Sequence, residues 1–209
     1  MDIRELRPRL WYWTALHPDW SPEQGGPDGW EQEVGSYAYV APDERTLVLF
    51  DPLVPEAGKD EFWHALDTDV EHHGPPHVLI TLFWHARSAE EIAKRYDSTQ
   101  VWAYAPARDE VAKRTPVTDV FAVGDPLPGG VEALPAGGDA NEVAFRVPEY
   151  DAVVVGDALA AAPGAPVRVW VGDESLRALL DHPLELLLLT HGEPVLAGGS
   201  EALARALEA

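Results

Sequence analysis

The sequence predicts an α+β fold in which two mixed β-sheets pack together and helices cover their outer faces. Strand-like segments outnumber helix-like ones, and the helix-like segments fall between pairs of strands. The strict β–α–β alternation of a single parallel sheet is missing. The chain has 209 residues, of which 46% are apolar, and this fits one globular domain over residues 1–209. A core of that size needs neither a disulfide nor a metal to form.

The first half of the chain alternates between aromatic or β-branched segments and helical patterns. Phe62, Leu66 and Val70 recur at helical spacing, and Ser88 with Glu91 forms a capping-box pattern at the start of a second helix. The expected strands are residues 10–16, 36–40, 46–50, 77–82 and 101–104. The expected helices are residues 59–71, 88–96 and 107–114.

The second half is mostly strands, and short turn-forming segments separate them. The expected strands are residues 120–123, 131–134, 142–147, 152–155, 167–171 and 186–189. Helices are expected over residues 174–181 and 200–208. The Ala/Pro/Gly segment 160–166 is too short for a domain linker, so we expect a surface loop there.

The charge balance excludes several classes of partner. There are 15 Lys and Arg residues against 36 Asp and Glu residues, a formal net charge of −21. Nucleic acids and anionic membranes bind clustered cations, which this chain lacks. No apolar window is long enough to span a bilayer, and the start of the chain does not resemble a signal peptide. We therefore expect a cytoplasmic protein whose partner is a small molecule; its oligomeric state is not indicated.

Common catalytic and metal-binding motifs are missing from the sequence. It contains no cysteine, which excludes thiolate zinc sites, disulfides and cysteine nucleophiles. It also lacks the Gly-x-Ser-x-Gly elbow, the Walker A loop, Gly-x-Gly-x-x-Gly and His-Glu-x-x-His. The candidate chemistry therefore lies in polar residues that follow buried strands.

Four strand ends carry such residues. One expected strand ends at Asp51, and another runs into the segment Thr81–Arg87. Later strands end at Asp157 and at His191. Pockets in β-rich scaffolds often form where the ends of several strands converge.

In their order and context, these segments resemble the metallo-β-lactamase superfamily. The family's Thr-His-x-His-x-Asp-His motif falls on Thr81–Arg87, its Gly-His-x-x-Gly segment on 137–141, its Gly-Asp on Gly156-Asp157 and its final Gly-His-Gly on Thr190–Gly192. The resemblance covers most of the chain and implies an αββα sandwich: two mixed sheets with helices outside.

The same alignment implies a degenerate metal centre. Where the family has metal-binding His or Asp residues, this chain has Leu82, Trp84, Ala86, Arg87 and Gly138. Four of these side chains offer no donor atom, and arginine does not deprotonate to become one. Asp157 and His191 are the ligands that remain. The resemblance therefore implies no dinuclear centre, and we expect no cofactor.

His85 keeps a metal site open as an alternative. It stands at a spacer position of the motif, and as a displaced ligand it would complete a mononuclear His85, Asp157 and His191 site for zinc or iron. The competing interpretation is a histidine that is hydrogen-bonded within a loop.

Arg87 and Trp84 suggest how the centre could do without metal. Arg87 is expected to pair with Asp157 and replace the lost cationic charge, while Trp84 fills the vacated volume. Alternatively, Arg87 is an exposed residue that caps its own loop.

Three further features each allow two interpretations. His191 with Glu193 is either an acid–base pair or a relic kept for the turn. The histidines at 72, 73 and 77 form either a metal-binding loop or a solvated turn. The loop from Trp20 to Trp30 is either a lid over a pocket or a plug at the edge of the core.

The sequence therefore favours a non-catalytic or specialised protein that binds a small ligand. Its expected pocket residues are Trp84, His85, Arg87, Asp157 and His191. The alternative is a hydrolase of an ester-type bond, with a mononuclear or metal-free site at His85, Asp157 and His191.

Overall fold

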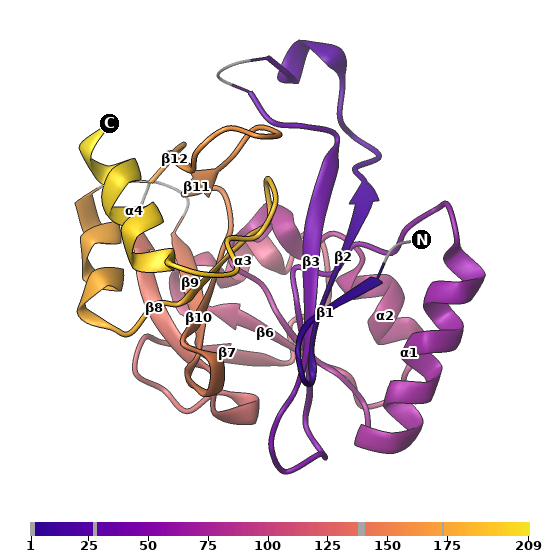
Figure 1. Cartoon of the computed structure of the whole chain (residues 1–209). Coiled ribbons are helices and arrows are strands. Elements are labelled where there is room, and N and C mark those ends of the chain that lie inside the picture. The colour runs from indigo at the N-terminus through magenta and orange to yellow at the C-terminus, as the bar shows by residue number, and fades with distance from the viewer. Residues whose placement is uncertain (1–2, 27–28, 138–140, 173) are drawn as a thin grey trace.

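Two β-sheets lie face to face, with helices on the outer side of each (Figure 1). The computed structural model describes residues 3–26, 29–137, 141–172 and 174–209. Most elements predicted from strand and helix patterns are present in this arrangement, so the predicted α+β class with an αββα sandwich is confirmed. No described helix has the length and apolarity needed to cross a membrane.

The first sheet has seven strands, and their order in space is their order in the chain. Strands β1 to β4 pair antiparallel, whereas β4 to β7 pair parallel. The strands are β1 (Ile3–Arg7), β2 (Leu10–Leu16), β3 (Glu33–Val40), β4 (Leu47–Phe50), β5 (His77–Leu79), β6 (Gln100–Tyr104) and β7 (Asp119–Phe121).

Helices of the first half cover the outer side of this sheet. They are α1 (Lys59–His73), α2 (Ala89–Arg95) and α3 (Arg108–Val111). Helix α1 buries Phe62, Trp63 and Leu66, and α2 buries Ile92. These side chains pack on the outward-facing residues of the strands, as the apolar stripe of an amphipathic helix does.

The second sheet has four strands in the order β13-β10-β9-β8. Strands β10 and β13 are parallel, and the other pairs are antiparallel. The strands are β8 (Glu132–Gly137), β9 (Glu142–Val147), β10 (Ala152–Val155) and β13 (Leu186–Leu189). The short hairpin β11 (Leu159–Ala160) and β12 (Arg168–Val169), the 3₁₀ helix η6 (Glu174–Asp181) and α4 (Gly199–Glu208) lie outside it.

The space between the sheets is filled by aromatic and branched side chains. Phe145 lies 5.7 Å from Phe50 and 5.8 Å from Phe121, measured between ring centroids. All three rings are almost fully buried. Their packing holds the two sheets at a fixed distance, and this fixes the relative positions of the strand ends that carry polar residues.

Local details differ from the expected elements. The strand expected over 77–82 ends at Leu79, because the backbone N–H of Thr81 donates to Asp51 Oδ1 at 2.8 Å rather than to a strand. Ser88 does not form the expected capping box. Its hydroxyl accepts from the N–H of Val54 at 3.0 Å instead, which ties α2 to the loop after β4.

Two other segments also differ. His72 and His73 form the last turn of α1 rather than a loop, and the helix expected over 174–181 is a 3₁₀ helix. Strands β1 and β11 were not expected. The first carries three charged residues in five, which hides its alternation, and the second is only two residues long.

Candidate functional site

The carboxyl ends of two parallel strand pairs meet between the sheets. In the first sheet β4 pairs with β5, and these strands lead to Asp51 and to the segment 80–88. In the second sheet β10 pairs with β13, and these strands lead to Asp157 and His191. Polar side chains from distant parts of the sequence therefore converge at one place.

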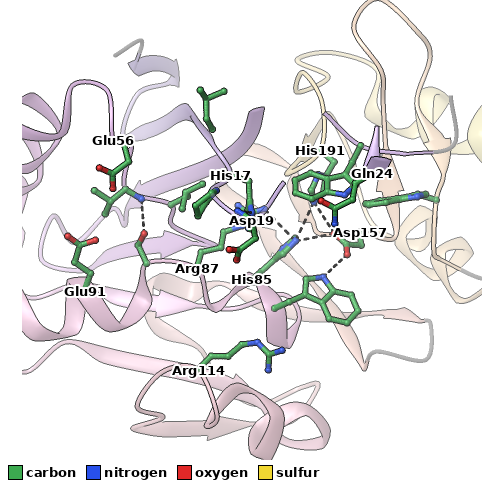
Figure 2. A pocket seen from close by; sticks show the side chains of 18 residues that line it. His17, Asp19, Gln24, Glu56, His85, Arg87, Glu91, Arg114, Asp157 and His191 are labelled. Carbon is green, nitrogen blue, oxygen red and sulfur yellow. Dashed lines mark hydrogen bonds and ion pairs between the residues drawn. The ribbon is translucent and has the colours of Figure 1, made fainter. Parts of the chain in front are cut away.

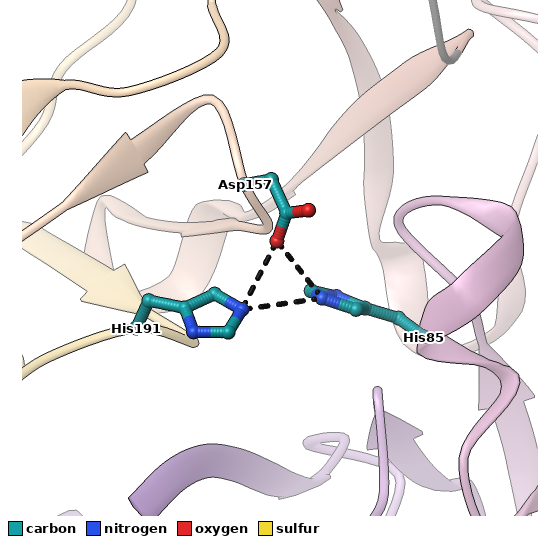
Figure 3. A group of neighbouring side chains, drawn as sticks. All are labelled: His85, Asp157 and His191. Carbon is teal, nitrogen blue, oxygen red and sulfur yellow. Dashed lines mark hydrogen bonds and ion pairs between the residues drawn. The ribbon is translucent and has the colours of Figure 1, made fainter. Parts of the chain in front are cut away.

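His85, Asp157 and His191 form a tight triangle (Figure 3). Asp157 Oδ1 lies 3.0 Å from His85 Nε2 and 3.0 Å from His191 Nε2. The two Nε2 atoms lie 3.4 Å apart. All three residues are buried, and in the described ranges they form the single group of three His, Asp or Glu residues close enough to share a metal ion. This group could bind a metal.

Asp51 fixes the orientation of His85. The fully buried Asp51 carboxylate receives a hydrogen bond from His85 Nδ1 at 2.8 Å and one from the Thr81 hydroxyl at 2.6 Å. The Nδ1 proton therefore points at Asp51, and Nε2 points at Asp157. The sequence had marked Asp51 as a strand end but not as a site residue.

A buried acceptor in the triangle lacks a directed donor. Asp157 Oδ1 accepts no well-aligned hydrogen bond, although two ring nitrogens lie beside it. With its proton on Nδ1, a neutral His85 presents a lone pair to the carboxylate, which is repulsive. A positive charge between these atoms, either a second proton or a metal ion, removes that repulsion.

The protonation equilibria show the same conflict. Burial and the Arg87 charge oppose protonation of His85, but Asp51 and Asp157 outweigh them and raise its pKa. Burial lowers the pKa of His191 to about 4, against the attraction of Asp157. Burial disfavours an ionised Asp157, yet the two histidines hold its pKa well below the usual range. The site thus holds a carboxylate and an uncharged His191, both of which are suitable ligands.

Arg87 does not pair with Asp157, so the predicted charge replacement is wrong. Its Nη1 donates to the carbonyls of Gly35 at 2.8 Å and Asp51 at 3.0 Å, and Nη2 lies 3.4 Å from His85 Nε2. The backbone of Arg87 has φ 37°, which turns the side chain inward. The alternative of an exposed arginine is also wrong, because the side chain is mostly buried.

Trp84 does not fill the space of lost ligands. Its side chain is at the surface, with 41% of the residue exposed, and Nε1 donates to Asp157 Oδ2 at 2.6 Å. The bond fixes the carboxylate so that Oδ1 faces the histidines. Leu82 and Ala86 are the buried residues at the replaced ligand positions, and Gly138 lies outside the described residues.

A cavity of about 660 Å³ opens above the triangle (Figure 2). Trp30 and Trp170 each place a ring edge-on to His191, with centroids 5.2 Å apart. All five expected pocket residues line this cavity, which is further lined by His17, Asp19, Gln24, Glu56, Glu91 and Arg114.

The loop after β2 places Trp30 between the cavity and the edge of the core. Trp30 lines the cavity and also packs on the small cluster of Ala15, Val34 and Leu53. The Trp20 Nε1–H donates to the Trp30 carbonyl at 2.9 Å and thereby holds the loop.

The proposed acid–base pair of His191 with Glu193 is wrong, because Glu193 pairs with Arg4 at 2.7 Å.

Sequence reasoning missed Glu142, at the start of β9. Only 5% of it is exposed, and its Oε1 accepts from the Ala158 N–H at 3.2 Å. Burial and the nearby charge of Asp157 raise its pKa to about 8, so it is an uncharged acid at neutral pH. The sequence carries no local signal for this burial, because β9 also contains the charged Arg146.

Comparison with solved structures identifies the architecture. The structure superposes on metallo-β-lactamase IND-7 with a TM-score of 0.70 and 16% identity, covering 100% of this chain and 98% of that one. The metallo-β-lactamase from Pontibacter korlensis gives a TM-score of 0.68 and 15% identity, covering 99% and 97%. The chain has the metallo-β-lactamase fold.

The same fold occurs in a flavodiiron core. The Flv1 flavodiiron core from Synechocystis matches with a TM-score of 0.70 and 15% identity, covering 99% of this chain and 60% of that one. No protein-family model and no curated protein sequence matches the chain. Within the metallo-β-lactamase fold, the function therefore has to be argued from the site itself.

Proposed function

We propose that this chain is a specialised small-ligand-binding protein whose metal centre holds a single ion. It holds one divalent ion, Zn²⁺ or Fe²⁺, between His85 Nε2, Asp157 Oδ1 and His191 Nε2. The observation that carries the proposal is the buried triangle of these three atoms, with sides of 3.0, 3.0 and 3.4 Å.

The triangle fits a single ion. Ligand bonds of about 2.0–2.1 Å in tetrahedral geometry place neighbouring donor atoms about 3.3–3.4 Å apart. The three sides are close to that spacing, and no side chain atom separates the donors. Asp51 binds the far nitrogen of His85, the arrangement in which a carboxylate orients a metal-binding histidine.

A second ion does not fit the described residues. Leu82 and Ala86 are buried and have no donor atom, and the Trp84 indole is only a hydrogen-bond donor. The centre is therefore degenerate relative to a dinuclear one.

Three protein ligands leave one coordination position for a ligand. Sites with three protein ligands and an open position are typical of catalytic metals, whereas structural zinc sites use four. A bound ion would supply Lewis-acid polarisation of a ligand oxygen. This observation favours hydrolysis of an ester-type bond as the second candidate function.

The chain's own residues prepare the pocket for such a ligand. Trp30 and Trp170 pack beside His191 and shield the triangle from solvent, while the Trp84 indole holds Asp157 Oδ2. Aromatic walls with a few polar groups at the base suit a small organic molecule.

Elemental analysis of protein purified without chelators tests the metal. We expect about one Zn or Fe per chain, and its loss in the variants His191→Ala and Asp157→Ala. His64→Ala is the matched control, because His64 is exposed on α1. Two ions per chain, or no ion even after incubation with Zn²⁺ and with Fe²⁺ under anaerobic conditions, would contradict the proposal.

An ester panel separates the two candidate functions. Wild-type turnover that depends on added metal, and that is absent in His191→Ala, establishes the hydrolase. Metal binding without turnover supports the binding protein.

A further inference from the structure

A second cavity lies on the other side of the first sheet, away from the metal-binding triangle. Its volume is about 300 Å³, and it lies between α1 and the outer face of β2 to β4. Figure 1 shows α1 on this outer side of the sheet. Its lining includes Trp11, Trp13, Phe62, Leu66 and Asp69.

The aromatic wall follows from strand and helix periodicity. Trp11 and Trp13 are two residues apart on β2, so both point to the outer face. Phe62 faces them from α1, with its ring centroid 5.5 Å from that of Trp13. The cavity therefore presents indole and phenyl surfaces from both sides.

Asp69 is anomalous in this setting. On α1 it follows Phe62 and Leu66 at helical spacing, so it occupies the apolar stripe of the helix. It is partly buried, and no hydrogen bond or ion pair joins it to any residue in the described part of the chain. Asp67, two residues earlier, pairs with Arg95 at 2.7 Å.

A partly buried carboxylate without a partner is unfavourable. Burial raises the pKa of Asp69, and His73 and His72 only partly offset that effect. A cation inside the cavity would compensate the cost of burying the charge. Rings that flank the carboxylate add attraction of their own, because a cation binds to the face of an indole.

We propose that this cavity binds a small organic cation with an ammonium group, which pairs with Asp69 and packs against Trp11. The chemistry distinguishes this ligand from others. A divalent metal ion requires several oxygen ligands, and the cavity offers one carboxylate. An uncharged ligand offers Asp69 at most a hydrogen bond and no compensating charge, and an anion is repelled by it. The net charge of −21 also favours the approach of cations.

Calorimetric titration with choline and with its neutral isostere 3,3-dimethyl-1-butanol tests the proposal. We expect choline to bind at least fivefold more tightly, because the two differ in the charge of the quaternary centre. Asp69→Asn should reduce that preference, and Trp11→Leu should weaken choline binding at least threefold. Glu71→Gln is the matched control, since Glu71 is an exposed acid on the same helix.

A further variant tests whether the ligand binds in the cavity beside α1. Because the pocket above the triangle also contains tryptophans and acids, Trp170→Leu is included and should leave choline binding unchanged. Circular dichroism and thermal unfolding of each variant show whether it is folded. Equal affinity for choline and the isostere, unchanged binding by folded Asp69→Asn, or loss of binding in Trp170→Leu would overturn the proposal. The result does not depend on whether the triangle holds a metal.

Discussion

Asp51 Oδ2 and His85 Nδ1 lie 2.8 Å apart in the interior of the protein, in the segments that follow the neighbouring parallel strands β4 and β5. The bond fixes the side of the imidazole that carries the proton. It therefore determines that His85 Nε2 faces Asp157 and His191, as a metal ligand would.

Replacing Asp51 by Asn tests the importance of this bond. Asn retains an oxygen for the Thr81 N–H but removes the negative charge that orients His85. We expect Zn²⁺ affinity to fall by about 10–100-fold, measured by competition with a chromogenic chelator. Asp43→Asn, an exposed acid in the turn between β3 and β4, should not change the affinity. Unchanged affinity in a folded Asp51→Asn protein contradicts the role given to Asp51.

Removing the metal should lower the thermal stability. An ion that binds only the native state, at a free concentration of 100 times its Kd, stabilises it by about 2.7 kcal/mol. For a chain of this size that corresponds to a Tm shift of about 5–10 °C. Scanning calorimetry with Zn²⁺ and with a chelator should show the shift in wild type and His64→Ala but not in His191→Ala. An equal shift in His191→Ala would place the ion elsewhere.

Glu142 should make stability fall as the pH rises. Its pKa is about 8 in the folded protein and 4.5 in the unfolded chain. The folded state therefore binds more protons between these values, so stability is fully present below pH 4.5 and is lost as the pH rises through 8. Each pKa unit corresponds to about 1.4 kcal/mol.

Urea unfolding of chelator-treated Glu142→Gln checks this dependence. At pH 5 we expect the variant and wild type to be similar, and at pH 9 we expect the variant to be more stable by about 2–5 kcal/mol. Glu185→Gln, an exposed site, should track wild type at both values. A constant difference between wild type and Glu142→Gln over this range would show that Glu142 is ionised in the folded protein.

Gly156→Ala should disturb the contacts that support the site. A Cβ there would lie 2.6 Å from the Thr81 hydroxyl and 2.9 Å from Glu142 Oε1, both too close for carbon. The hydroxyl would have to move from Asp51. We expect a loss of about 1–3 kcal/mol in the free energy of unfolding together with weaker Zn²⁺ binding. Wild-type values for both quantities would show that this close contact is not needed.

The fold could be predicted from the sequence because the patterns that indicate its strands and helices are local. Alternating and continuous apolar runs located most strands within a few residues, and the spacing of Phe62, Leu66 and Val70 located α1. The order of strand ends then pointed to the metallo-β-lactamase fold, which the structure has. Local patterns failed where a tertiary contact competed, as at Ser88, whose hydroxyl binds the Val54 N–H instead of capping α2.

The site was only partly predictable. Asp157 and His191 follow buried strands, and that is visible in the sequence. The contacts of Arg87 were not, because the unusual backbone at φ 37° directs its guanidinium to main-chain carbonyls. Glu142 and Asp69 were missed for a related reason: their burial depends on what packs against them, and no local pattern shows it.

His85 and His191 touch across a sequence separation of 106 residues, and they follow strands of different sheets. During synthesis on the ribosome, the first ligand emerges long before the last. A nascent chain that ends between residues 85 and 157 has His85 and Asp51 but neither Asp157 nor His191. The proposed metal site can therefore form only after His191 has been made, and ion loading would report that the second sheet has closed on the first.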